Sequence, residues 1–358
     1  MAADKMAVAE HILTYAETLD GGGVERAQLR LAQGWIAAGR RVTLAVGSVD
    51  GPLAAELPQG LAIVPVRPAS YAGLFGLPRI ARELQPDIIF CPGSFYTGAA
   101  CWTRLRLGRE CPPIVGKVSN ALRRGDHHAL FDLGHGIWLR QHPRFLDRIV
   151  AMTEASARDA MLRMRVSPAR IATIPNPPVR TLLPGATVPG LPPRYVLGVG
   201  RLVRQKRWDR LVAAVAQLAT PIPLVILGEG GERRAITAQA RALGVELHLP
   251  GHAANPLAVM AGAAALALTS DYEGVPGVLR EALSVGTPVV TTDSSPAVGE
   301  IVSLPHHGAI IPRDDGDALV AALDRWLAPD APRPAPVTLP GIDSVERYLA
   351  LFDSLMPA

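Results

Sequence analysis

The chain has 358 residues, of which 49% are hydrophobic, and a formal net charge of +4 at pH 7. This length exceeds one ordinary hydrophobic core and predicts two domains of roughly 150 to 180 residues each. No apolar run reaches the roughly 18 residues of a membrane-spanning helix, and the N-terminus lacks a signal-peptide pattern, so the sequence predicts a cytoplasmic protein.

Short apolar runs alternate with amphipathic stretches along the first half of the chain. We expect strands at residues 11–16, 41–46, 61–66, 87–91, 113–118 and 148–153. Helices are expected after most of them, and the first, over residues 24–39, ends at Gly39, a residue that suits a helix C-terminus. This alternation is typical of β-α units around a parallel sheet. A first Rossmann-like domain is expected over residues 1–180.

The three cysteines fall within this first half. Cys91, Cys101 and Cys111 are odd in number and have no C-x-x-C spacing. We therefore expect buried thiols rather than a zinc site or a disulfide framework.

A proline-rich linker over residues 174–194 separates the two halves, because proline is excluded from helix interiors and central strands. The pattern then restarts, with strands expected at residues 195–200, 224–230, 245–250, 265–270, 288–293 and 308–312. A second Rossmann-like domain is expected over residues 188–335, and a final helix over residues 344–355, in a segment 340–358 that packs back on the first domain. The predicted fold is α/β, with two domains facing each other across a cleft.

Ligands of parallel sheets bind where strands end and helices begin. The first such loop, residues 18–28, contains Gly21, Gly22 and Gly23 before a helix N-terminus that can receive an anion. A plain tight turn explains these glycines equally well. The loop matches neither the G-x-G-x-x-G fingerprint nor a Walker sequence.

The loop after the first strand of the second domain carries two glycines, Gly198 and Gly200, and two cations, Arg201 and Lys206. It lacks the next glycine of a nicotinamide fingerprint. Cations near a helix start are unfavourable unless an anion lies between them, so we expect a phosphate-binding role. A third glycine-rich loop, at Gly228, follows the next strand.

The segment DYEGVPGVLREALSVGTPVVTTD places Glu273 in a loop and Glu281 eight positions later, inside a helix that begins near Pro276. The carboxylate of Glu281, if it faces a ligand, can accept two hydrogen bonds from vicinal hydroxyls such as those of a ribose. An ion pair between Glu281 and a surface arginine is the alternative.

Together these motifs resemble the retaining, nucleotide-sugar-dependent glycosyltransferases of family 4, which have the two-domain GT-B fold. The resemblance covers nearly the whole chain. It rests on residues 21–26, the segment RIATIPNPP, Gly200-Arg201 with Lys206, LGEG, and the E-x7-E pattern followed by GTPVV. It implies a nucleoside diphosphate sugar as donor, a glycan or lipid-linked hydroxyl as acceptor, and no metal or other cofactor.

The resemblance also implies roles for individual residues. Glu273 would face the transferred sugar, Glu281 would hold the ribose, and Arg201 and Lys206 would neutralise the diphosphate. The remaining positions that would line the donor are Gly22, Gly23, Gly200, Gly228, Gly274, Val275, Pro276 and Gly277.

The acceptor side departs from the family pattern. Many relatives carry a histidine where this chain has Ser119 and Asn120, so Asn120 and the nearby His127 or His128 are the candidates there.

A D-x-D pattern typical of metal-dependent glycosyltransferases occurs at Asp315 and Asp317. It stands directly before a helical sequence, which predicts a helix cap rather than a metal site.

Other activities remain open at the level of sequence. They are a UDP-sugar epimerase of GT-B fold and a non-catalytic nucleotide-sugar-binding subunit. A Rossmann dehydrogenase fits poorly, because no complete dinucleotide fingerprint is present.

Residues 101–150 contain nine Lys/Arg and only four Asp/Glu. This excess predicts attraction to an anionic membrane surface or a phosphorylated acceptor, with an ordinary solvated surface as the alternative. Nucleic acid is not expected, because the segment has few aromatic residues and no recognisable motif. Peripheral association with the inner face of the membrane is therefore expected, through Arg104, Arg106, Arg109, Arg123 and Arg124, with Trp102 and Phe131.

Overall fold

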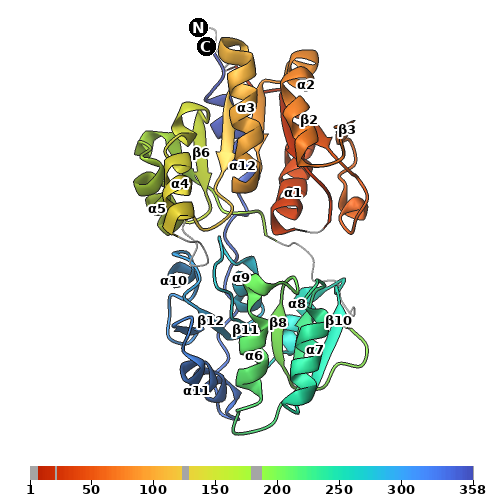
Figure 1. Ribbon diagram of the computed structural model, residues 1–358, viewed down its shortest axis with the longest axis vertical. Coiled ribbons are helices and arrows are strands. Elements are labelled where there is room, and N and C mark those ends of the chain that lie inside the picture. Colours follow the sequence, from red (N-terminus) through yellow and green to blue (C-terminus); the bar gives the residue numbers. More distant parts are fainter. Residues whose placement is uncertain (1–6, 21, 123–128, 179–187, 358) are drawn as a thin grey trace. The chain divides into compact units, whose positions relative to one another are not determined.

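The computed structural model describes residues 7–20, 22–122, 129–178 and 188–357. The chain divides into two compact units (Figure 1). Of the described residues, the first unit contains 7–122 apart from residue 21, 129–178 and 340–357, and the second contains 188–339. The final stretch of the chain thus belongs to the unit formed by the first half.

The first unit is built on a seven-stranded sheet in the order β3-β2-β1-β4-β5-β6-β7, and each paired neighbour runs parallel. The strands are β1 His11–Ala16, β2 Arg41–Val46, β3 Ala62–Pro65, β4 Ile88–Cys91, β5 Ile114–Lys117, β6 Arg148–Ala151 and β7 Ile171–Thr173. The central strands β1, β4 and β5 are buried along their whole length, as expected for strands covered on both faces.

The helices of the first unit are α1 Gly23–Ala37, α2 Leu77–Leu84, α3 Thr97–Leu107, α4 Ala129–Leu139, α5 Glu154–Met164 and α12 Ser344–Asp353. Short 3₁₀ helices lie at η1 Ala54–Glu56, η2 Tyr71–Gly76, η3 Ser94–Tyr96, η4 Gly108–Glu110, η5 His142–Arg144 and η6 Pro168–Arg170. The connection from β3 crosses to β4, so the helices that follow lie on the opposite face of the sheet from α1.

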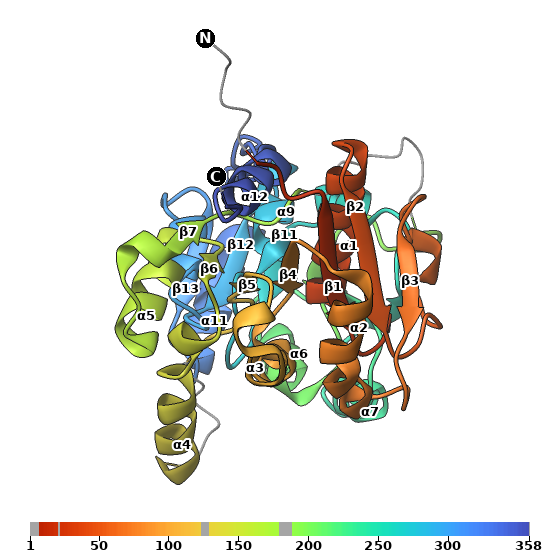
Figure 2. The same ribbon diagram turned by 90° about the horizontal axis from the view of Figure 1, so that it is seen from above.

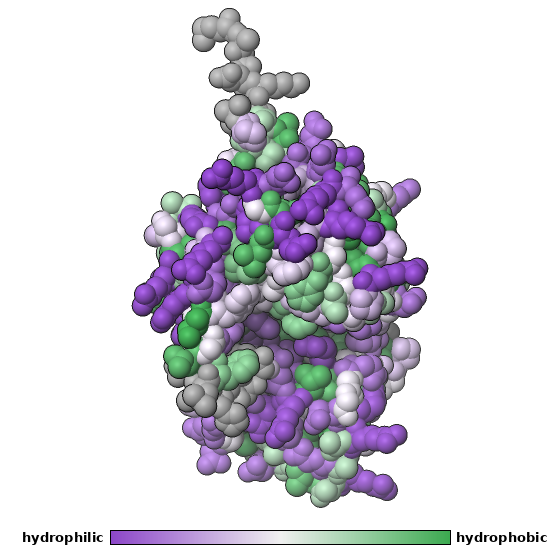
Figure 3. Space-filling model, turned by 45° about the horizontal axis from the view of Figure 1, so that its top comes forward, coloured by the Kyte–Doolittle hydropathy of each residue, from purple (hydrophilic) through white to green (hydrophobic). Residues whose placement is uncertain are grey.

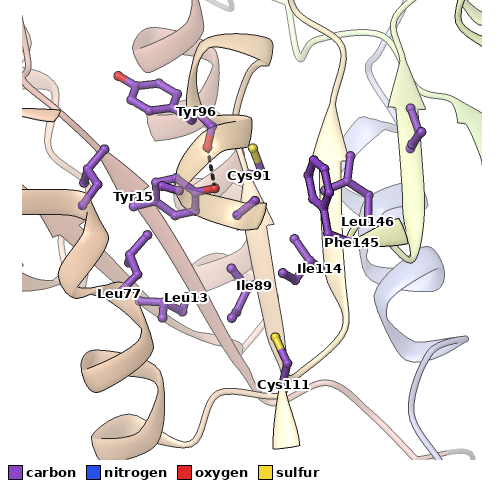
Figure 4. Packing of buried hydrophobic residues seen from close by; sticks show 14 of the residues in the cluster. Leu13, Tyr15, Leu77, Ile89, Cys91, Tyr96, Cys111, Ile114, Phe145 and Leu146 are labelled. Atoms are coloured by element: carbon purple, nitrogen blue, oxygen red, sulfur yellow. Dashed lines mark hydrogen bonds between the residues drawn. The ribbon is translucent and has the colours of Figure 1, made fainter. Parts of the chain in front are cut away.

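One face of this sheet packs against α2, α3 and α5. Leu13, Ile89 and Ile114 of the strands meet Leu77 of α2 and Leu146 before β6 in one buried cluster (Figure 4). The hydroxyl group of Tyr15 donates to the carbonyl oxygen of Tyr96 at 3.2 Å within this cluster (Figure 4). The phenol thus satisfies its polar atom inside an apolar core.

The other face is covered by α1 and α12, and Figure 2 shows α12 on the opposite side of the sheet from α3 and α4. Trp35 of α1 packs edge-on against Phe90 of β4 and Phe352 of α12, with ring centroids 5.2 Å apart in both pairs. Asp353 accepts hydrogen bonds from the backbone N–H of Ala9 and from Arg40, at 2.8 and 2.9 Å. The returning helix α12 therefore completes the hydrophobic core of the first unit.

The second unit has a six-stranded parallel sheet in the order β10-β9-β8-β11-β12-β13. The strands are β8 Val196–Val199, β9 Leu224–Leu227, β10 Leu247–Gly251, β11 Ala265–Leu268, β12 Val289–Thr292 and β13 Gly308–Ile311. The helices are α6 Trp208–Val215, α7 Arg233–Ala242, α8 Pro256–Gly262, α9 Gly277–Ser284, α10 Val298–Ile301 and α11 Gly316–Leu327, with the 3₁₀ helix η7 Arg204–Lys206.

Helices α6, α7 and α11 share one buried cluster with the sheet, and α8, α9 and α10 share the other. The strand order reverses direction between β8 and β11. The loops after these two neighbouring strands lead to helices on opposite faces, which is where parallel α/β sheets bind ligands.

The structure confirms the predicted α/β class and its two parallel sheets. All six predicted strands of the second unit are present, and among the strands in the described residues β7 of the first unit has no predicted counterpart. This strand is three residues long, half-buried and at the edge of its sheet, so its sequence lacks the continuous apolar run of a central strand. The cysteines are free thiols, with Cys91 and Cys111 buried and Cys101 partly exposed.

Candidate functional site

The loop between β8 and α6 folds closely over the indole ring of Trp208. A Cβ atom at Gly198 would lie 2.7 Å from this ring, so no larger residue fits there. The indole N–H of Trp208 donates to the carbonyl oxygen of Arg201 at 3.0 Å. This anchoring leaves the Arg201 side chain exposed and turns Lys206 inward.

Lys206 and Glu273 meet at the centre of this region. The Nζ atom of Lys206 lies 2.5 Å from Oε1 of Glu273, and the two side chains are only 13% and 11% exposed. The hydroxyl group of Ser270 donates to the same carboxylate oxygen at 2.5 Å. Two residues that the sequence assigned to one ligand are thus in direct contact, and Ser270 joins them.

The loops after β8 and β11 are held together by further hydrogen bonds. Gln205 donates from its side chain to the carbonyl oxygen of Tyr272 at 2.8 Å and accepts at its own carbonyl from the N–H of Asp271 at 3.0 Å. The hydroxyl group of Thr269 donates to the carbonyl oxygens of Lys206 and Arg207. The position of Lys206 is therefore fixed by the loop that carries Glu273. Sequence reasoning missed Ser270 and Gln205, because a single serine or glutamine in a loop has no distinguishing spacing.

The glycine-rich loop after β9 packs against the loop after β8. A Cβ atom at Gly228 would lie 2.1 Å from the carbonyl oxygen of Gly200, and one at Gly230 would lie 2.3 Å from that of Leu202. Both glycines also have positive φ values, +137° and +158°. Gly228 therefore supports the loop that carries Arg201, and its contact with a donor stays a prediction.

Helix α9 follows Glu273 closely. Pro276 is the N-cap residue and Gly277 is the first helical residue, so the helix begins where the sequence predicts. Gly274 and Val275 are half-buried in the loop between Glu273 and this helix, and Gly277 is exposed. Glu281 lies in the second turn and is half-buried. The first N–H groups of α9 thus follow directly from the loop that holds Glu273.

The D-x-D pattern forms a helix cap, as the sequence predicts. The carboxylate of Asp315 accepts a hydrogen bond from the N–H of Ala318 at 2.9 Å at the start of α11. Asp317 occupies the first turn of the same helix, where a carboxylate complements the helix dipole. Across the residues that the structure describes, no group of three or more His, Cys, Asp or Glu side chains is placed to hold a metal ion.

The glycine loop of the first unit is occupied by a carboxylate. Gly22 is the N-cap residue of α1, and a Cβ atom there would lie 2.0 Å from Oε2 of Glu25. The phenol of Tyr96 donates to Oε1 of Glu25 at 2.8 Å. Gly23, at the first position of α1, is exposed. The acidic side chain therefore already complements this helix N-terminus.

The acceptor-side candidates lie beyond β5. Asn120 is exposed, and its neighbour Ser119 exchanges two hydrogen bonds with Ser94, at 3.0 and 3.2 Å. His127 and His128 lie outside the described residues. The structure thus brings Ser119 to the loop after β4, and the role of Asn120 stays a prediction.

A buried lysine that the sequence did not single out lies at the end of β5. Lys117 is 2% exposed, and its Nζ atom donates to Oδ1 of Asn176 at 3.2 Å. Burial lowers the pKa of Lys117 to about 8, although the charges of Glu25 and Cys91 act in the opposite direction. A lysine within a basic segment is normally solvated, which is why its sequence context gave no signal.

The basic segment of residues 101–150 is partly structural. Arg104 forms an ion pair with Asp147 and donates to the carbonyl oxygens of Cys111 and Phe145, so it has a structural role, and its contact with a membrane stays a prediction. Lys117 is buried, as described above. Arg106 and Arg109 are exposed, whereas Arg123 and Arg124 lie outside the described residues. None of the helices in the described ranges combines the length and apolar character that a membrane crossing requires.

Two family models match successive parts of the chain. Residues 21–177 match the model described as Glycosyltransferase Family 4, and residues 185–335 match the model described as Glycosyl transferases group 1. The second match contains Arg201, Lys206, Glu273 and Glu281. The two matches follow the two units closely.

Relatives with known names match over part of the chain. A stretch of 144 residues is 33% identical to the N-acetylgalactosamine-N,N'-diacetylbacillosaminyl-diphospho-undecaprenol 4-alpha-N-acetylgalactosaminyltransferase of Campylobacter jejuni, and it covers 40% of each chain. A stretch of 183 residues is 29% identical to an uncharacterized glycosyltransferase of Haemophilus influenzae, covering 50% of this chain and 51% of that one. The chain thus matches about half the length of these relatives.

Solved structures share the fold over nearly the whole chain. Anabaena Alr3699/HepE in complex with UDP-glucose has a TM-score of 0.74 at 18% identity, covering 96% of this chain and 97% of that one. WaaG, a glycosyltransferase involved in lipopolysaccharide biosynthesis, has a TM-score of 0.64 at 17% identity, covering 96% and 95%. From the two family models and this shared GT-B fold we conclude that the chain belongs to the family 4 type of glycosyltransferases.

Proposed function

We propose that the chain is a retaining glycosyltransferase that moves a hexose from a nucleoside diphosphate sugar to a hydroxyl group of a glycan or lipid-linked acceptor. The observation that carries this proposal is the contact between Lys206 and Glu273 at the ends of β8 and β11. A cation for the diphosphate and a carboxylate for the sugar lie side by side there. A donor bound at this point would place its diphosphate–sugar linkage between them.

The proposed reaction exchanges one bond at the anomeric carbon. The bond from this carbon to the diphosphate oxygen breaks, and a bond to the acceptor oxygen forms on the same face of the sugar. The leaving diphosphate oxygen takes the proton of the acceptor hydroxyl. Arg201 and Lys206 stabilise the negative charge that grows on the diphosphate, so no enzyme nucleophile and no metal ion is part of the proposal.

Glu273 has a second role in this proposal. Without a donor, its carboxylate neutralises the ammonium group of Lys206 and accepts from Ser270. An arriving diphosphate competes for the ammonium group, while Ser270 keeps one carboxylate oxygen in place. The free carboxylate oxygen can then accept a hydrogen bond from a sugar hydroxyl. In the same proposal Glu281, one turn into α9, binds the ribose.

The nature of the acceptor is inferred from the relatives. The Campylobacter jejuni relative is named for a diphospho-undecaprenol acceptor, and a second relative from that organism is also named for a PP-undecaprenol acceptor. We propose an acceptor of this chemical class, a saccharide on a polyprenyl diphosphate, used in surface polysaccharide or glycolipid assembly. The reaction would then occur on the cytoplasmic side of the membrane.

A donor screen tests the proposal. UDP-, GDP-, ADP- and TDP-sugars are added separately to the protein, and a ligand that binds only the folded state raises its melting temperature. The bound donor is then incubated with a lipid-linked saccharide, and the anomeric configuration of the product is read by NMR. A product with inverted configuration contradicts retention. Free epimerised sugar without acceptor transfer would identify an epimerase instead.

A further inference from the structure

The loop after β12 lies directly against Glu273, the residue that carries the proposed sugar contact. The backbone N–H of Glu273 donates to the carbonyl oxygen of Ser294 at 2.9 Å. The hydroxyl group of Thr292, the last residue of β12, donates to the carbonyl oxygen of Ser270 at 2.6 Å. Strands β11 and β12 are parallel neighbours, so the loops that follow them meet at one edge of the sheet. The loop that holds Ser294 is therefore fixed beside Glu273.

The side chain of Ser294 is buried without a hydrogen bond. Ser294 is 5% exposed, and its Oγ atom has no hydrogen-bond partner among the residues that the structure describes. Polar side chains at the surface are satisfied by water, and Figure 3 shows hydrophilic residues over much of the side that it presents. A hydroxyl group that leaves water without gaining a partner costs free energy. An unpaired hydroxyl group at this position therefore calls for an explanation.

The neighbouring hydroxyl groups show that this region can satisfy its polar atoms. The other buried serines and threonines in the ends of β11 and β12 and the loops after them are Thr269, Ser270, Thr291, Thr292 and Ser295. The first four donate hydrogen bonds to other oxygen atoms of the protein. Ser295 accepts one from the backbone N–H of Ala297 at 3.3 Å. Ser294 is thus an exception among its immediate neighbours.

Its place in the sheet also distinguishes Ser294. In the described part of the second unit, the other buried side-chain polar atoms without a partner belong to His307 and Trp326. His307 directly precedes β13, and Trp326 lies in the last turn of α11, so both are near the amino ends of the strands. Ser294 lies at the carboxyl ends, where parallel α/β sheets bind their ligands.

The order of the strands indicates which part of a donor would reach Ser294. Strand β11 lies between β8 and β12 (Figure 1). The loop after β8 carries Arg201 and Lys206, the cations of the proposed diphosphate site, whereas the loop after β12 carries Ser294. Glu273, in the loop after β11, lies between them. A donor with its diphosphate on the β8 side of Glu273 would extend its sugar toward Ser294.

We propose that Ser294 binds the transferred sugar, by a hydrogen bond between its hydroxyl group and a hydroxyl group of the sugar ring. The inference rests on the proposed function, which places the sugar at Glu273. A serine hydroxyl group can donate and accept, and it turns about a single side-chain torsion, so it can meet a sugar hydroxyl without backbone movement. It gives up no bond within the protein when it does so. Ser294 would then select sugars that carry a hydroxyl group at the position that faces it.

Isothermal titration calorimetry of the full chain tests the proposal. The probes are UDP, UDP-glucose, UDP-N-acetylgalactosamine, GDP and GDP-mannose. For the nucleotide sugar that the wild type binds most tightly, Ser294→Ala should weaken binding by about five- to tenfold, through loss of one hydrogen bond. The affinity for the corresponding nucleoside diphosphate should stay unchanged. The melting temperature of the free variant should equal or exceed that of the wild type, because the substitution removes an unpaired hydroxyl group.

The adjacent serine provides a matched control. The hydroxyl group of Ser295 accepts from the N–H of Ala297, the residue that precedes α10. Ser295→Ala should therefore lower the melting temperature and leave the affinities for the nucleotide sugar and the nucleoside diphosphate unchanged. The two variants differ by one position in the same loop, so their opposite results separate a contact with the sugar from support of the fold.

Deoxygenated analogues of the bound nucleotide sugar identify the contact on the ligand. Each analogue lacks one hydroxyl group of the sugar. One of them should bind the wild type about five- to tenfold more weakly than the parent compound. The same analogue should bind Ser294→Ala as tightly as the parent does, because the hydrogen bond is already lost. Equal losses in the wild type and the variant for every analogue would contradict the proposed contact.

Three further outcomes would overturn the role of Ser294. They are equal affinity of the wild type and Ser294→Ala for the nucleotide sugar, an equal loss for the nucleotide sugar and the nucleoside diphosphate, and a lowered melting temperature of the free variant. The last would show that the hydroxyl group already has a partner. Turnover in the wild type with any of these three results contradicts the role of Ser294 alone. The predicted losses without transfer to any acceptor contradict the proposed reaction alone, and a wild type that binds none of the probes contradicts both.

Discussion

Lys206 and Glu273 lie 67 residues apart in the chain, yet their side chains form an ion pair with an Nζ–Oε1 distance of 2.5 Å. One residue follows β8 and the other follows β11, the two strands between which the order of the sheet reverses. Both side chains are nearly buried, so each compensates a charge that would otherwise be costly to desolvate. The same two residues therefore stabilise the loops after β8 and β11 and supply the proposed contacts to the donor.

Breaking this pair should affect stability and activity in different ways. Lys206→Ala leaves the Glu273 carboxylate buried without its cation, and should reduce the free energy of unfolding by about 2–3 kcal/mol. It should also lower turnover by about 10² or more, through loss of a charge at the diphosphate. Denaturant unfolding and steady-state kinetics measure the two effects.

The double variant K206M/E273Q serves as its control. It removes both charges, so much of the stability should return while the activity remains lost. If the double variant recovers activity, the pair is structural only and the proposed roles of both residues fail.

Arg201 offers a test without a stability effect. Its side chain is exposed, so Arg201→Ala should leave the melting temperature unchanged while turnover falls by about 10². Arg204, exposed three residues later and assigned no role, is the matched control, and Arg204→Ala should retain wild-type kinetics. Equal kinetics for the two variants would remove Arg201 from the diphosphate site.

Two experiments test whether the activity depends on a metal ion: addition of the chelator EDTA, and substitution of Asp315, which caps α11. Activity should persist in excess EDTA, because the proposal uses Arg201 and Lys206 in place of an ion. Asp315→Ala should cost about 1 kcal/mol of stability through the lost cap but leave turnover intact at low temperature. Loss of activity in EDTA with recovery on adding Mn²⁺ or Mg²⁺ would return Asp315 and Asp317 to consideration as ligands.

The buried ammonium group of Lys117 predicts an unusual pH dependence of stability. Its pKa is lowered to about 8 in the folded protein, below the model-peptide value of about 10.4 in the unfolded chain. Between these values the unfolded chain binds more protons, so the contribution of Lys117 to stability should rise with pH. Relative to Lys117→Met, the wild type should gain up to about 3 kcal/mol between pH 7 and pH 10.5. A difference that does not vary with pH would show that Lys117 titrates normally.

The aromatic contact of α12 with the first unit should be a major source of its stability. Phe352→Ala should cost about 3–5 kcal/mol, because the ring is fully buried against Trp35 and Phe90. The neighbouring Tyr348→Phe is the control. The Tyr348 hydroxyl is buried without a hydrogen-bond partner in the described part of the chain, so its removal should be neutral or stabilising. Thermal or denaturant unfolding distinguishes the two results.

The β-α alternation could be predicted from sequence because central parallel strands are continuous apolar runs. Strands such as β9, with the sequence LVIL, and β12, with VVTT, are buried along their whole length. A proline, Pro223 or Pro288, directly precedes each of these two strands and marks where the preceding turn ends. The strand β7 escaped prediction because an edge strand is buried only in part. Local sequence patterns report burial, and burial is incomplete at the edge of a sheet.

The site could be predicted only in part. Charged residues in glycine-rich loops drew attention to Lys206 and Glu273, but their direct contact depends on the order of β8 and β11 in the sheet. Lys117 and Glu25 were missed for a related reason, since their hydrogen-bond partners, Asn176 and Tyr96, lie far away in sequence. The charge count of residues 101–150 also treated Arg104 as free, although Asp147, 43 residues later, binds it.

The return of α12 to the first unit has a consequence for how the protein is made. On the ribosome, residues 344–353 follow the whole second unit, so they emerge after residues 188–339 have been synthesised. Until then, Trp35 and Phe90 lack the rings of Tyr348 and Phe352 that cover them. The second unit can therefore complete its core during synthesis, whereas the first unit, although translated earlier, must finish later. This reverses the usual order in which the N-terminal domain folds first.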